Sequence, residues 1–481
     1  MKARIFAEAN RKWWTLAALS FALFMIMLDN TIVNVALPSI QRDLGIGVSE
    51  LEWVVTGYAL SFAVLMLSGG KLADMYGRRR VFLSGLVVFT LSSLACGLAG
   101  GAGLLIGARV VQGAGAAFMM PATLSIISAT FPPRERGAAI GIWAGVSAMA
   151  LAIGPLVGGL ITEHISWNWI FYVNVPVGAL AVAATLLIVP ESRDTTHVQR
   201  LDVPGLLVSA GGLFALVFAL IEGSHYGWSS PTILSLFAAA AIALVAFVLL
   251  ERHQRLPMMD LSLFRQGTFA GANIVALLVS LAMFGVFFFV SLYMQNILGY
   301  SAVEAGATFL PMTVLIILVA PLAGKTSDRF GSRWLMAVGM TLTGLSLLVY
   351  AQLETGSSFW NVLPGLLLGG IGMAMAMSPM TAAALGAVPV DKAGVGSGIL
   401  NTFRQVGGAL GIAIMGAILT DRSATALAAG ASREEAFMAG FTRSLYVGAG
   451  FAFAAAVVAA LLVRTHHPSP AREPAQEPAV V

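Results

Sequence analysis

Long apolar runs separated by short polar segments dominate the hydrophobic pattern of this chain. Fourteen of these runs are long enough to cross a bilayer, which takes about 17–25 helical residues. They lie near residues 13–34, 52–70, 81–99, 103–122, 138–161, 168–189, 204–222, 231–250, 268–296, 304–323, 334–351, 359–383, 394–420 and 441–464. A lone span must satisfy its own backbone hydrogen bonds, so we expect helices. The pattern predicts an all-α membrane protein with 14 transmembrane helices.

A short polar segment, residues 70–80, joins the second and third apolar runs. It reads Gly-Lys-Leu-Ala-Asp-Met-Tyr-Gly-Arg-Arg-Arg, and a similar segment, Gly-Lys-Thr-Ser-Asp-Arg-Phe-Gly-Ser-Arg, begins 254 positions later at Gly324. Glycine lets helix ends approach closely and adopt positive φ, and arginines keep a turn at the cytoplasmic surface. Each copy therefore predicts a tight turn between two membrane helices.

The two turns indicate a duplicated chain. A second echo supports this reading, because five residues recur at a constant offset of 257: Gly137, Gly141, Ile142, Gly154 and Gly159 return as Gly394, Gly398, Ile399, Gly411 and Gly416. Internal repeats of this kind are typical of transporters. We expect two pseudo-symmetric six-helix bundles, 1–190 and 267–464, with a two-span insert and its cytoplasmic linkers at 191–266. Residues 465–481, rich in Pro, Ala and Glu, are expected to form a disordered cytoplasmic tail.

Composition agrees with a membrane protein. Hydrophobic residues make up 58% of the 481 and charged residues 10%, against roughly 25% charged in soluble domains. With the N-terminus placed inside, 21 of the 27 Lys and Arg fall in cytoplasmic segments and 4 in outside segments. This asymmetry predicts that both termini are cytoplasmic. The net charge of +4 belongs to these loops, which argues against nucleic-acid binding.

Several functions are disfavoured by missing motifs. The histidines have no metal-ligand spacing, so we expect no metal site. A phosphate-binding glycine loop followed by Lys-Ser/Thr is absent, so ATP is not expected as the fuel. No nucleophile elbow or hydrolase carboxylate pair occurs, and the cytoplasmic loops are too short for a catalytic or signalling domain. The sequence thus predicts a secondary transporter and no cofactor, with a proton gradient as the energy source.

Asp29 lies in the first predicted span, where a carboxylate is costly to bury. Asn30 and Asn34 share a helix face at i, i+4, so the polar residues of this span cannot all face lipid. One interpretation is that Asp29 and Asn34 line a central cavity, where Asp29 exchanges protons or meets substrate. The alternative is a structural polar anchor near the outer end of the span.

Arg109 is the second costly group, in the fourth span. A guanidinium there needs a carboxylate or carbonyl partner, and Asp29 is the best candidate within the same half. Gln112 follows one turn further along the same face. We expect Arg109 and Gln112 to join Asp29 in a proton-coupling or substrate site. A purely structural ion pair is the alternative.

Two further groups of residues are candidates. Gly154, Pro155, Gly158 and Gly159 predict a kink and a smooth packing face in the fifth span, which either controls opening or only packs tightly. In the second half, Gln295 and Arg404 form a possible polar site. For Arg404, a gating pair with Asp391 or a loop carbonyl is as good a hypothesis as substrate contact.

Together these motifs resemble the major facilitator superfamily, in particular its fourteen-span drug:proton antiporters. The segments that carry the resemblance are the 70–80 turn, Leu105 to Ala117, Gly154 to Gly159, Leu28 to Pro38, Trp167 to Pro176 and Asn401 to Gly408. The resemblance covers nearly all of residues 10–465. Asn168 departs from it, since the family usually has Arg there, and Ser332 stands where the first turn has Arg78.

The resemblance implies a fold and residue roles. The fold would be the major facilitator fold, with Asp29 as a proton-coupling or substrate-facing carboxylate that Arg109 modulates. Gly70, Asp74, Gly77 and Arg78, with Asp328 and Arg329 in the second copy, would form a conformational latch. In it, Asp74 would meet the helix that starts at 394. Gly154 and Pro155 would shape the interface that separates exporters from importers.

The function expected from these features is proton-coupled antiport in a bacterial inner membrane. The chain would export lipophilic or cationic drugs by alternating access and so confer antibiotic resistance. The alternative is proton-coupled import or export of one specific metabolite. The expected partners are small amphiphilic substrates and the lipid bilayer, with a periplasmic adaptor protein as an optional partner.

Overall fold

The computed structural model describes residues 8–193, 202–254, 257, 259–388 and 393–464. Every regular element in these ranges is a helix. Within the same ranges, 13 helical segments are long and apolar enough to cross a membrane. The prediction of an all-α membrane protein is confirmed. Helix α6, with 32 residues, is not among the 13, so the count of fourteen spans stays a prediction.

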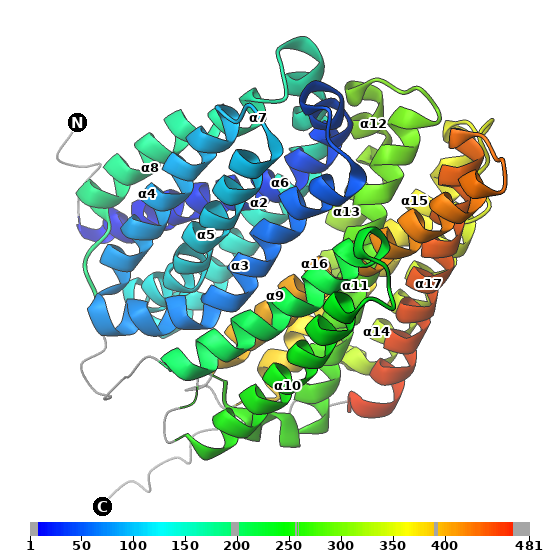
Figure 1. Cartoon of the computed structure of the whole chain (residues 1–481). Coiled ribbons are helices and arrows are strands. Elements are labelled where there is room, and N and C mark those ends of the chain that lie inside the picture. Colours follow the sequence, from blue (N-terminus) through cyan, green and yellow to red (C-terminus); the bar gives the residue numbers. More distant parts are fainter. Residues whose placement is uncertain (1–7, 194–201, 255–256, 258, 389–392, 465–481) are drawn as a thin grey trace, which may run out of the picture.

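The first half of the chain forms a helical bundle, called here the N half (Figure 1). Its helices are α2 (Glu8–Leu44), α3 (Val48–Tyr76), α4 (Arg78–Gly97), α5 (Ala102–Thr130), α6 (Pro133–His164), α7 (Trp169–Tyr172) and α8 (Asn174–Ile188). Apolar side chains from α2, α3, α4 and α5 make a core of their own. Several of these helices exceed the predicted spans, because their polar ends continue as helix beyond the apolar run.

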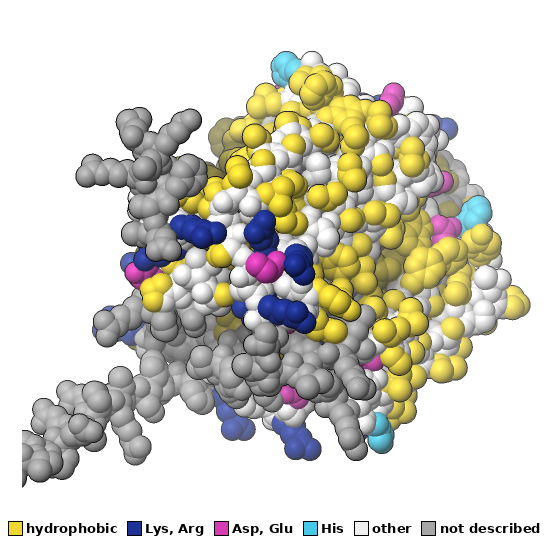
Figure 2. All heavy atoms as spheres, turned by 90° about the vertical axis from the view of Figure 1, so that its left-hand side faces the viewer, with side chains coloured by type: hydrophobic (Ala, Val, Ile, Leu, Met, Phe, Trp, Pro, Cys, Tyr) yellow, Lys and Arg dark blue, Asp and Glu magenta, His cyan; other side chains and the backbone are white. Residues whose placement is uncertain are grey.

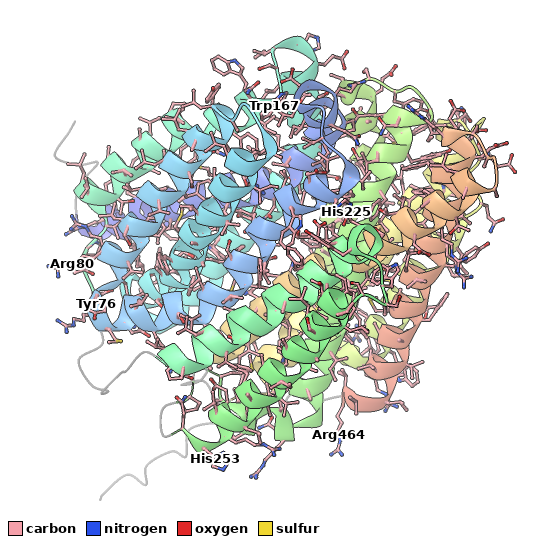
Figure 3. The ribbon with its side chains drawn as sticks, viewed as in Figure 1. Tyr76, Arg80, Trp167, His225, His253 and Arg464 are labelled. Carbon is pink, nitrogen blue, oxygen red and sulfur yellow. The ribbon has the colours of Figure 1, made fainter. Side chains whose placement is uncertain are left out.

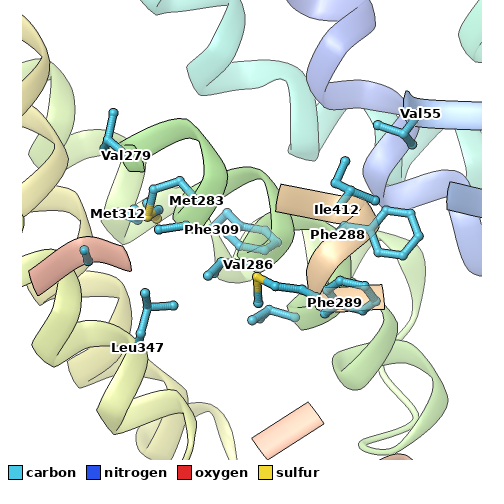
Figure 4. Close-up of a cluster of buried hydrophobic side chains, with 14 of the residues drawn as sticks. Val55, Val279, Met283, Val286, Phe288, Phe289, Phe309, Met312, Leu347 and Ile412 are labelled. Atoms are coloured by element: carbon cyan, nitrogen blue, oxygen red, sulfur yellow. The ribbon is translucent and has the colours of Figure 1, made fainter. Parts of the chain in front are cut away.

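The second half forms a similar bundle, called the C half. Its elements are the 3-10 helix η1 (Leu261–Arg265), α11 (Gly267–Asn296), α12 (Ala302–Thr308), α13 (Leu310–Phe330), α14 (Ser332–Tyr350), α15 (Phe359–Gly386), α16 (Ala393–Ala428) and α17 (Arg433–Leu462). Figure 4 shows part of its apolar core, where Phe288 of α11 and Ile412 of α16 lie near Val55 of α3. The core therefore continues from the C half into the N half.

The same helix pairings occur in both halves. Helix α5 packs against α3 and α4, and α15 packs against α13 and α14. Likewise α2 packs against α6 and α8, while α11 packs against α16 and α17. This correspondence agrees with the duplication inferred from the glycine spacing. That a twofold axis relates the halves, and that domains divide at residues 190 and 266, stays a prediction, and the predicted tail lies outside the described residues.

Two helices, α9 (Val203–Tyr226) and α10 (Pro231–His253), form the insert between the halves. In Figure 1 they lie in front of the region where the blue and yellow bundles meet. Helix α9 contacts both α3 and α16, whereas α10 packs mainly against α9. Only 11% of the most apolar window of α10 is buried. Helix α9 is thus part of the junction between the halves, and α10 is its peripheral cover.

The two predicted turns are present as helix hairpins. Gly77 ends α3 and begins α4 with φ 110°, and Gly331 ends α13 and begins α14 with φ 85°. Both values lie in the region that only glycine adopts easily, as expected from the sequence. We call the end of the bundle that carries these turns the hairpin end, and the opposite one the far end.

Side chains mark the two ends and the sides of the molecule. Tyr76 and Arg80 lie at the hairpin end and Trp167 at the far end (Figure 3). Figure 2 shows Lys and Arg gathered on the side toward which the first hairpin points, with hydrophobic side chains over much of the remaining view. Large exposed side chains such as Leu187 and Ile242 are what a lipid-facing surface requires.

Candidate functional site

Asp29 lies at the centre of a buried polar network inside the N half. Its Oδ2 is 2.5 Å from Arg109 Nη1, and its Oδ1 accepts hydrogen bonds from Gln112 Nε2 at 2.9 Å and Asn174 Nδ2 at 3.1 Å. Asn174 also donates to Ser93 Oγ at 3.0 Å. None of the five side chains is more than 2% exposed. The expected pair of Asp29 and Arg109 is therefore present, with Gln112 as its neighbour.

Arg109 of α5 is held by several partners besides Asp29. Nε donates to the Val54 carbonyl of α3 at 3.1 Å, and Nη1 also donates to Gln112 Oε1 at 2.7 Å. The guanidinium carbon lies 4.1 Å from the centroid of the Tyr58 ring, in the arrangement that favours a cation over an aromatic face. A buried ion pair is stable only when its remaining polar atoms are also satisfied, and both carboxylate oxygens of Asp29 have partners here.

The direction of Asp29 differs from the prediction that it lines a central cavity. It is 0% exposed and points into the N half, between α5 and α8. Asn30 and Asn34 occupy another face of α2, where they are partly exposed and donate to backbone carbonyls one turn earlier. Successive residues differ by about 100° around a helix, which separates Asp29 from this face. Asp29 therefore cannot touch a substrate in this conformation.

The glycines of α6 pack closely on two sides, against α2 within the N half and against α12 of the C half. A side chain at Gly154 would collide with Thr31 of α2, and one at Gly159 would collide with the backbone of Ala302 in α12. Gly306 of α12 in turn lies against the Pro155 carbonyl. Gly159 and Gly306 thus let the backbones of the two halves approach directly. Gly158, like Gly154, is packed against α2 within the N half, where it meets Ile32.

Hydrogen bonds join the halves at the far end. Ser291 Oγ of α11 donates to the Asn34 carbonyl at 3.0 Å, and Gln295 Nε2 donates to the Val35 carbonyl at 2.9 Å. The Val303 amide donates to Glu163 Oε2 at 2.9 Å. Gln295 is only 7% exposed, so in this conformation it fastens α11 to α2. Its predicted role as a substrate contact stays a prediction.

Arg404 lies elsewhere, on α16, and no described residue forms a hydrogen bond or an ion pair with it. Its side chain is partly exposed. Asp391, its predicted alternative partner, lies outside the described residues. The structure thus does not bring Arg404 together with Gln295 or with the Asp29 network, and its role stays a prediction.

The predicted latch residues are tied to their own half. Arg78 pairs with Asp74 at 3.0 Å, one turn away. The Arg78 amide donates to the Ser192 carbonyl, and the Arg79 amide donates to Glu191 Oε1. The hairpin is therefore fastened to the segment that follows α8. The contact of Asp74 with the helix that starts at 394 stays a prediction, and the Asp328 side chain lies outside the described residues.

Four buried residues were missing from the predicted site: Asn174, Ser93, Tyr58 and Glu52. The first three complete the network around Asp29 and Arg109. Glu52 of α3 is a separate buried carboxyl, 1% exposed. It sits at the edge of a predicted span, where an acidic residue suggests a loop. Among the described residues, no cluster of His, Cys, Asp or Glu could hold a metal ion.

A helical membrane bundle with two matching halves and an ion pair buried in one of them has the organisation of a membrane transporter. Comparison with known proteins gives the family. The model of the Major Facilitator Superfamily matches residues 19–204, 203–412 and 276–480. The chain belongs to this superfamily, as its motifs suggested, and is a transporter and not an enzyme.

Curated relatives are similar over most of their length. The tetracenomycin C resistance and export protein of Streptomyces glaucescens is 38% identical over 86% of this chain and 77% of that protein. The multidrug resistance protein Stp of Mycobacterium tuberculosis is 41% identical over 84% and 75%. The puromycin resistance protein pur8 of Streptomyces alboniger is 38% identical over 94% and 90%.

Solved structures share the fold at low identity. A bacterial homologue of the human lysosomal transporter Spinster, in an inward-facing and unoccupied conformation, has a TM-score of 0.68 at 18% identity, covering 96% of this chain and 99% of that one. The peptide transporter PepTSo has a TM-score of 0.69 at 16% identity, covering 94% and 97%. These likenesses establish the fold alone.

Proposed function

We propose that this chain is a drug exporter of a bacterial inner membrane that exchanges protons for lipophilic or cationic small molecules. The hairpin end would face the cytoplasm, as the distribution of Lys and Arg suggests. Support for export comes from the relatives, which are named resistance or export proteins for tetracenomycin C, puromycin and multiple drugs. Shared superfamily membership and 38–41% identity make a related task for this chain the simplest proposal.

The observation that carries the coupling proposal is the closed network around Asp29. With Asp29 ionised, the charge of Arg109 is compensated and Oδ1 accepts two amide hydrogen bonds. A proton on Asp29 would convert one acceptor into a donor and leave the always-charged guanidinium without a counter-ion. An uncompensated buried charge costs several kcal/mol. The network would therefore rearrange, and α2 with it.

The same change offers a way for proton and drug to compete. Asn30 and Asn34 place a polar, partly exposed face of α2 beside the network. When Asp29 is protonated, the N half carries one more positive charge behind that face. For a cation about 10 Å away at an effective dielectric of about 20, the repulsion is roughly 1.7 kcal/mol, more than tenfold in affinity. Protonation would thus expel a cationic substrate without direct contact.

Alternating access would use the far-end contact described above. To release substrate on that side, Gly159 must separate from α12, Gly306 must separate from Pro155, and Gln295 must leave α2. These contacts consist of small-residue packing and a few hydrogen bonds rather than interdigitated large side chains. Separation of the two halves therefore leaves no large cavity behind. The proposed substrates are therefore amphiphilic molecules that enter between the halves.

Everted membrane vesicles from a pump-deleted bacterial host test the proposal. A proton gradient should drive uptake of the cationic dye ethidium, and adding ethidium should release protons from the vesicle lumen. Asp29→Asn should abolish proton-driven uptake. Asp43→Asn is the matched control, since Asp43 follows the same helix face outward and only accepts a hydrogen bond from Trp167.

Two results would count against the proposal. Proton-driven dye uptake by Asp29→Asn at the wild-type rate would remove Asp29 from coupling. Gradient-driven dye loss from everted vesicles, rather than uptake, would indicate import in the cell.

A further inference from the structure

Glu52 is a buried carboxyl that no side chain compensates. It lies one turn inside the far-end start of α3 and is 1% exposed. No described residue donates a hydrogen bond to its Oε1. Burying a carboxylate without a donor or a cation is unfavourable by several kcal/mol. The structure therefore favours the neutral acid at this position.

The carboxyl group packs directly on the C half. A Cβ at Gly416 of α16 would overlap Glu52 Oε1 and lie 2.6 Å from Oε2. Next to this contact, Val55 and Ile412 belong to the core shared by both halves (Figure 4). Even a methyl group at Gly416 would collide with the carboxyl, whereas a proton on Glu52 needs no further space.

The insert completes the surroundings of Glu52. Helix α9 packs against α3 and α16 through an apolar cluster that includes Val64, Ile221 and Ala413. Beside Ile221, Glu222 accepts hydrogen bonds from Ser49 Oγ at 3.0 Å and Trp53 Nε1 at 3.2 Å. Glu222 is thus a satisfied carboxylate, and its negative charge acts on Glu52. The two acids differ in environment: one has donors and the other has none.

Among the described residues, no basic group forms an ion pair with Glu52 or Glu222. The other charged and titratable groups on the helices around α3 have partners of their own or lie further along their helices. On α3 itself, Glu50 accepts a hydrogen bond from the Gly47 amide. The groups on the neighbouring helices are Arg42, Asp43 and Asp29 on α2, Arg109 on α5, His225 on α9, and Arg404, Asp421 and Arg422 on α16. Glu222 is a charged neighbour that acts on Glu52 electrostatically.

From this geometry we propose that Glu52 is a proton-binding site at the junction of the N half, the C half and the insert, and that its protonation permits the far end to close. When the halves separate there, Glu52 meets far-side water and releases its proton to it. When they close, the carboxylate takes one proton back from that water and packs against Gly416. The insert contributes to the site through Glu222, because the negative charge of Glu222 favours the protonated form of Glu52.

This site deepens the proposed function and rests on its alternating access, but it is independent of Asp29. It makes closure sensitive to the pH on the far side. One linked proton changes the ratio of closed to open molecules by up to about tenfold per pH unit in the range where Glu52 is ionised when open. Acid therefore favours the closed far end.

Distance measurements between spin labels test the site on the full chain in proteoliposomes, without any substrate. Labels at His164→Cys and Asn296→Cys flank the far-end contact, and the native Cys96 is buried. In otherwise unaltered protein, the short-distance population should grow as pH falls. Glu52→Gln, which mimics the neutral acid, should stay closed at all pH values. Glu222→Gln should keep the pH dependence but move it to lower pH.

A second variant tests the same contact independently, in case Glu52→Gln does not fold. Gly416→Ala places a methyl group on the Glu52 oxygens and should reduce the closed population at every pH. Gly450→Ala on α17, where a Cβ meets nothing within 4 Å, is its control and should behave as the unaltered protein.

Several outcomes would overturn the proposal. Unchanged pH dependence in Glu52→Gln removes Glu52 from closure, and closure driven by Na⁺ at constant pH would make the site a metal site. Asp29→Asn measured in parallel separates this inference from the proposed function. If Asp29→Asn abolishes dye transport while Glu52→Gln leaves closure unchanged, only this inference fails. If Asp29→Asn transports normally while Glu52→Gln loses pH dependence, only the role of Asp29 fails.

Discussion

Asn174 reaches across 145 positions of sequence to place its side-chain amide 3.1 Å from Asp29 Oδ1. It is the first residue of α8, directly after the short helix α7. The same amide nitrogen donates to Ser93 Oγ at 3.0 Å, and Ser93 donates onward to the Phe171 carbonyl at 2.9 Å. Asn174 thereby links α2, α4 and α8 around the buried carboxylate.

We expect Asn174→Ala to destabilise the N half. The variant leaves a buried charged acceptor with one donor fewer, which costs about 1–3 kcal/mol. Thermal unfolding in detergent, followed by a thiol-reactive dye, measures this loss, because Cys96 is the chain's single cysteine and is buried. Asn168→Ala is the control, since Asn168 is partly exposed and donates only to the Gly97 carbonyl. Equal melting temperatures for the two variants would contradict the expectation.

Arg109→Lys should fail even though it keeps the positive charge. Lysine can neither donate to the Val54 carbonyl in the place of Nε nor lie flat over the Tyr58 ring. We expect a loss of about 1–3 kcal/mol in stability and a large loss of dye transport in everted vesicles. Arg80→Lys, whose side chain is 78% exposed, should leave both unchanged. Normal transport by Arg109→Lys would mean that charge alone suffices in the network.

The first hairpin offers a test of backbone strain. Gly77 has φ 110°, and a Cβ there would also meet the Glu191 carboxylate. Gly77→Ala should therefore cost at least about 1–2 kcal/mol. Gly70 lies within α3, where a Cβ would be in ordinary contact with Pro121, so Gly70→Ala should be neutral or slightly stabilising. Thermal unfolding of both variants checks the order, and a Gly70→Ala variant less stable than Gly77→Ala would refute the assignment of strain.

Much of this architecture is predictable from sequence because membrane spans and costly charges leave strong signals. Arg109 has few possible counter-ions within its half, so its pairing with Asp29 follows from elimination. Gln112 follows from helix periodicity. The fold itself follows from the apolar runs and the repeated glycines.

Other features could not be predicted, for physical reasons. The polar residues of α2 at 29, 30, 31 and 34 cover more than half of the helix circumference, so sequence alone cannot decide which of them faces the bundle interior. Asn174 and Ser93 are neutral, and neutral side chains occur in many spans without a special role. Glu52 lies so near a helix start that only the packing of α16 reveals its burial.

The far-end contact between α6 and α12 gives the last prediction. A Cβ at Gly159 would collide with the Ala302 carbonyl oxygen and would lie 2.8 Å from the Val303 Cα. Both neighbours are backbone atoms, which cannot rotate away as a side chain can. Gly159→Ala should therefore hold the halves apart at the far end. Spin labels at His164→Cys and Asn296→Cys should show a longer distance at every pH, and dye transport should fall at least about tenfold. Gly145→Ala makes the same substitution earlier in α6, where a Cβ meets nothing within 4 Å, and should leave distance and transport unchanged. If Gly159→Ala instead transports as the unaltered protein does, the close approach of α6 and α12 is not needed for the cycle, and the far end must close through α3 and α16 alone.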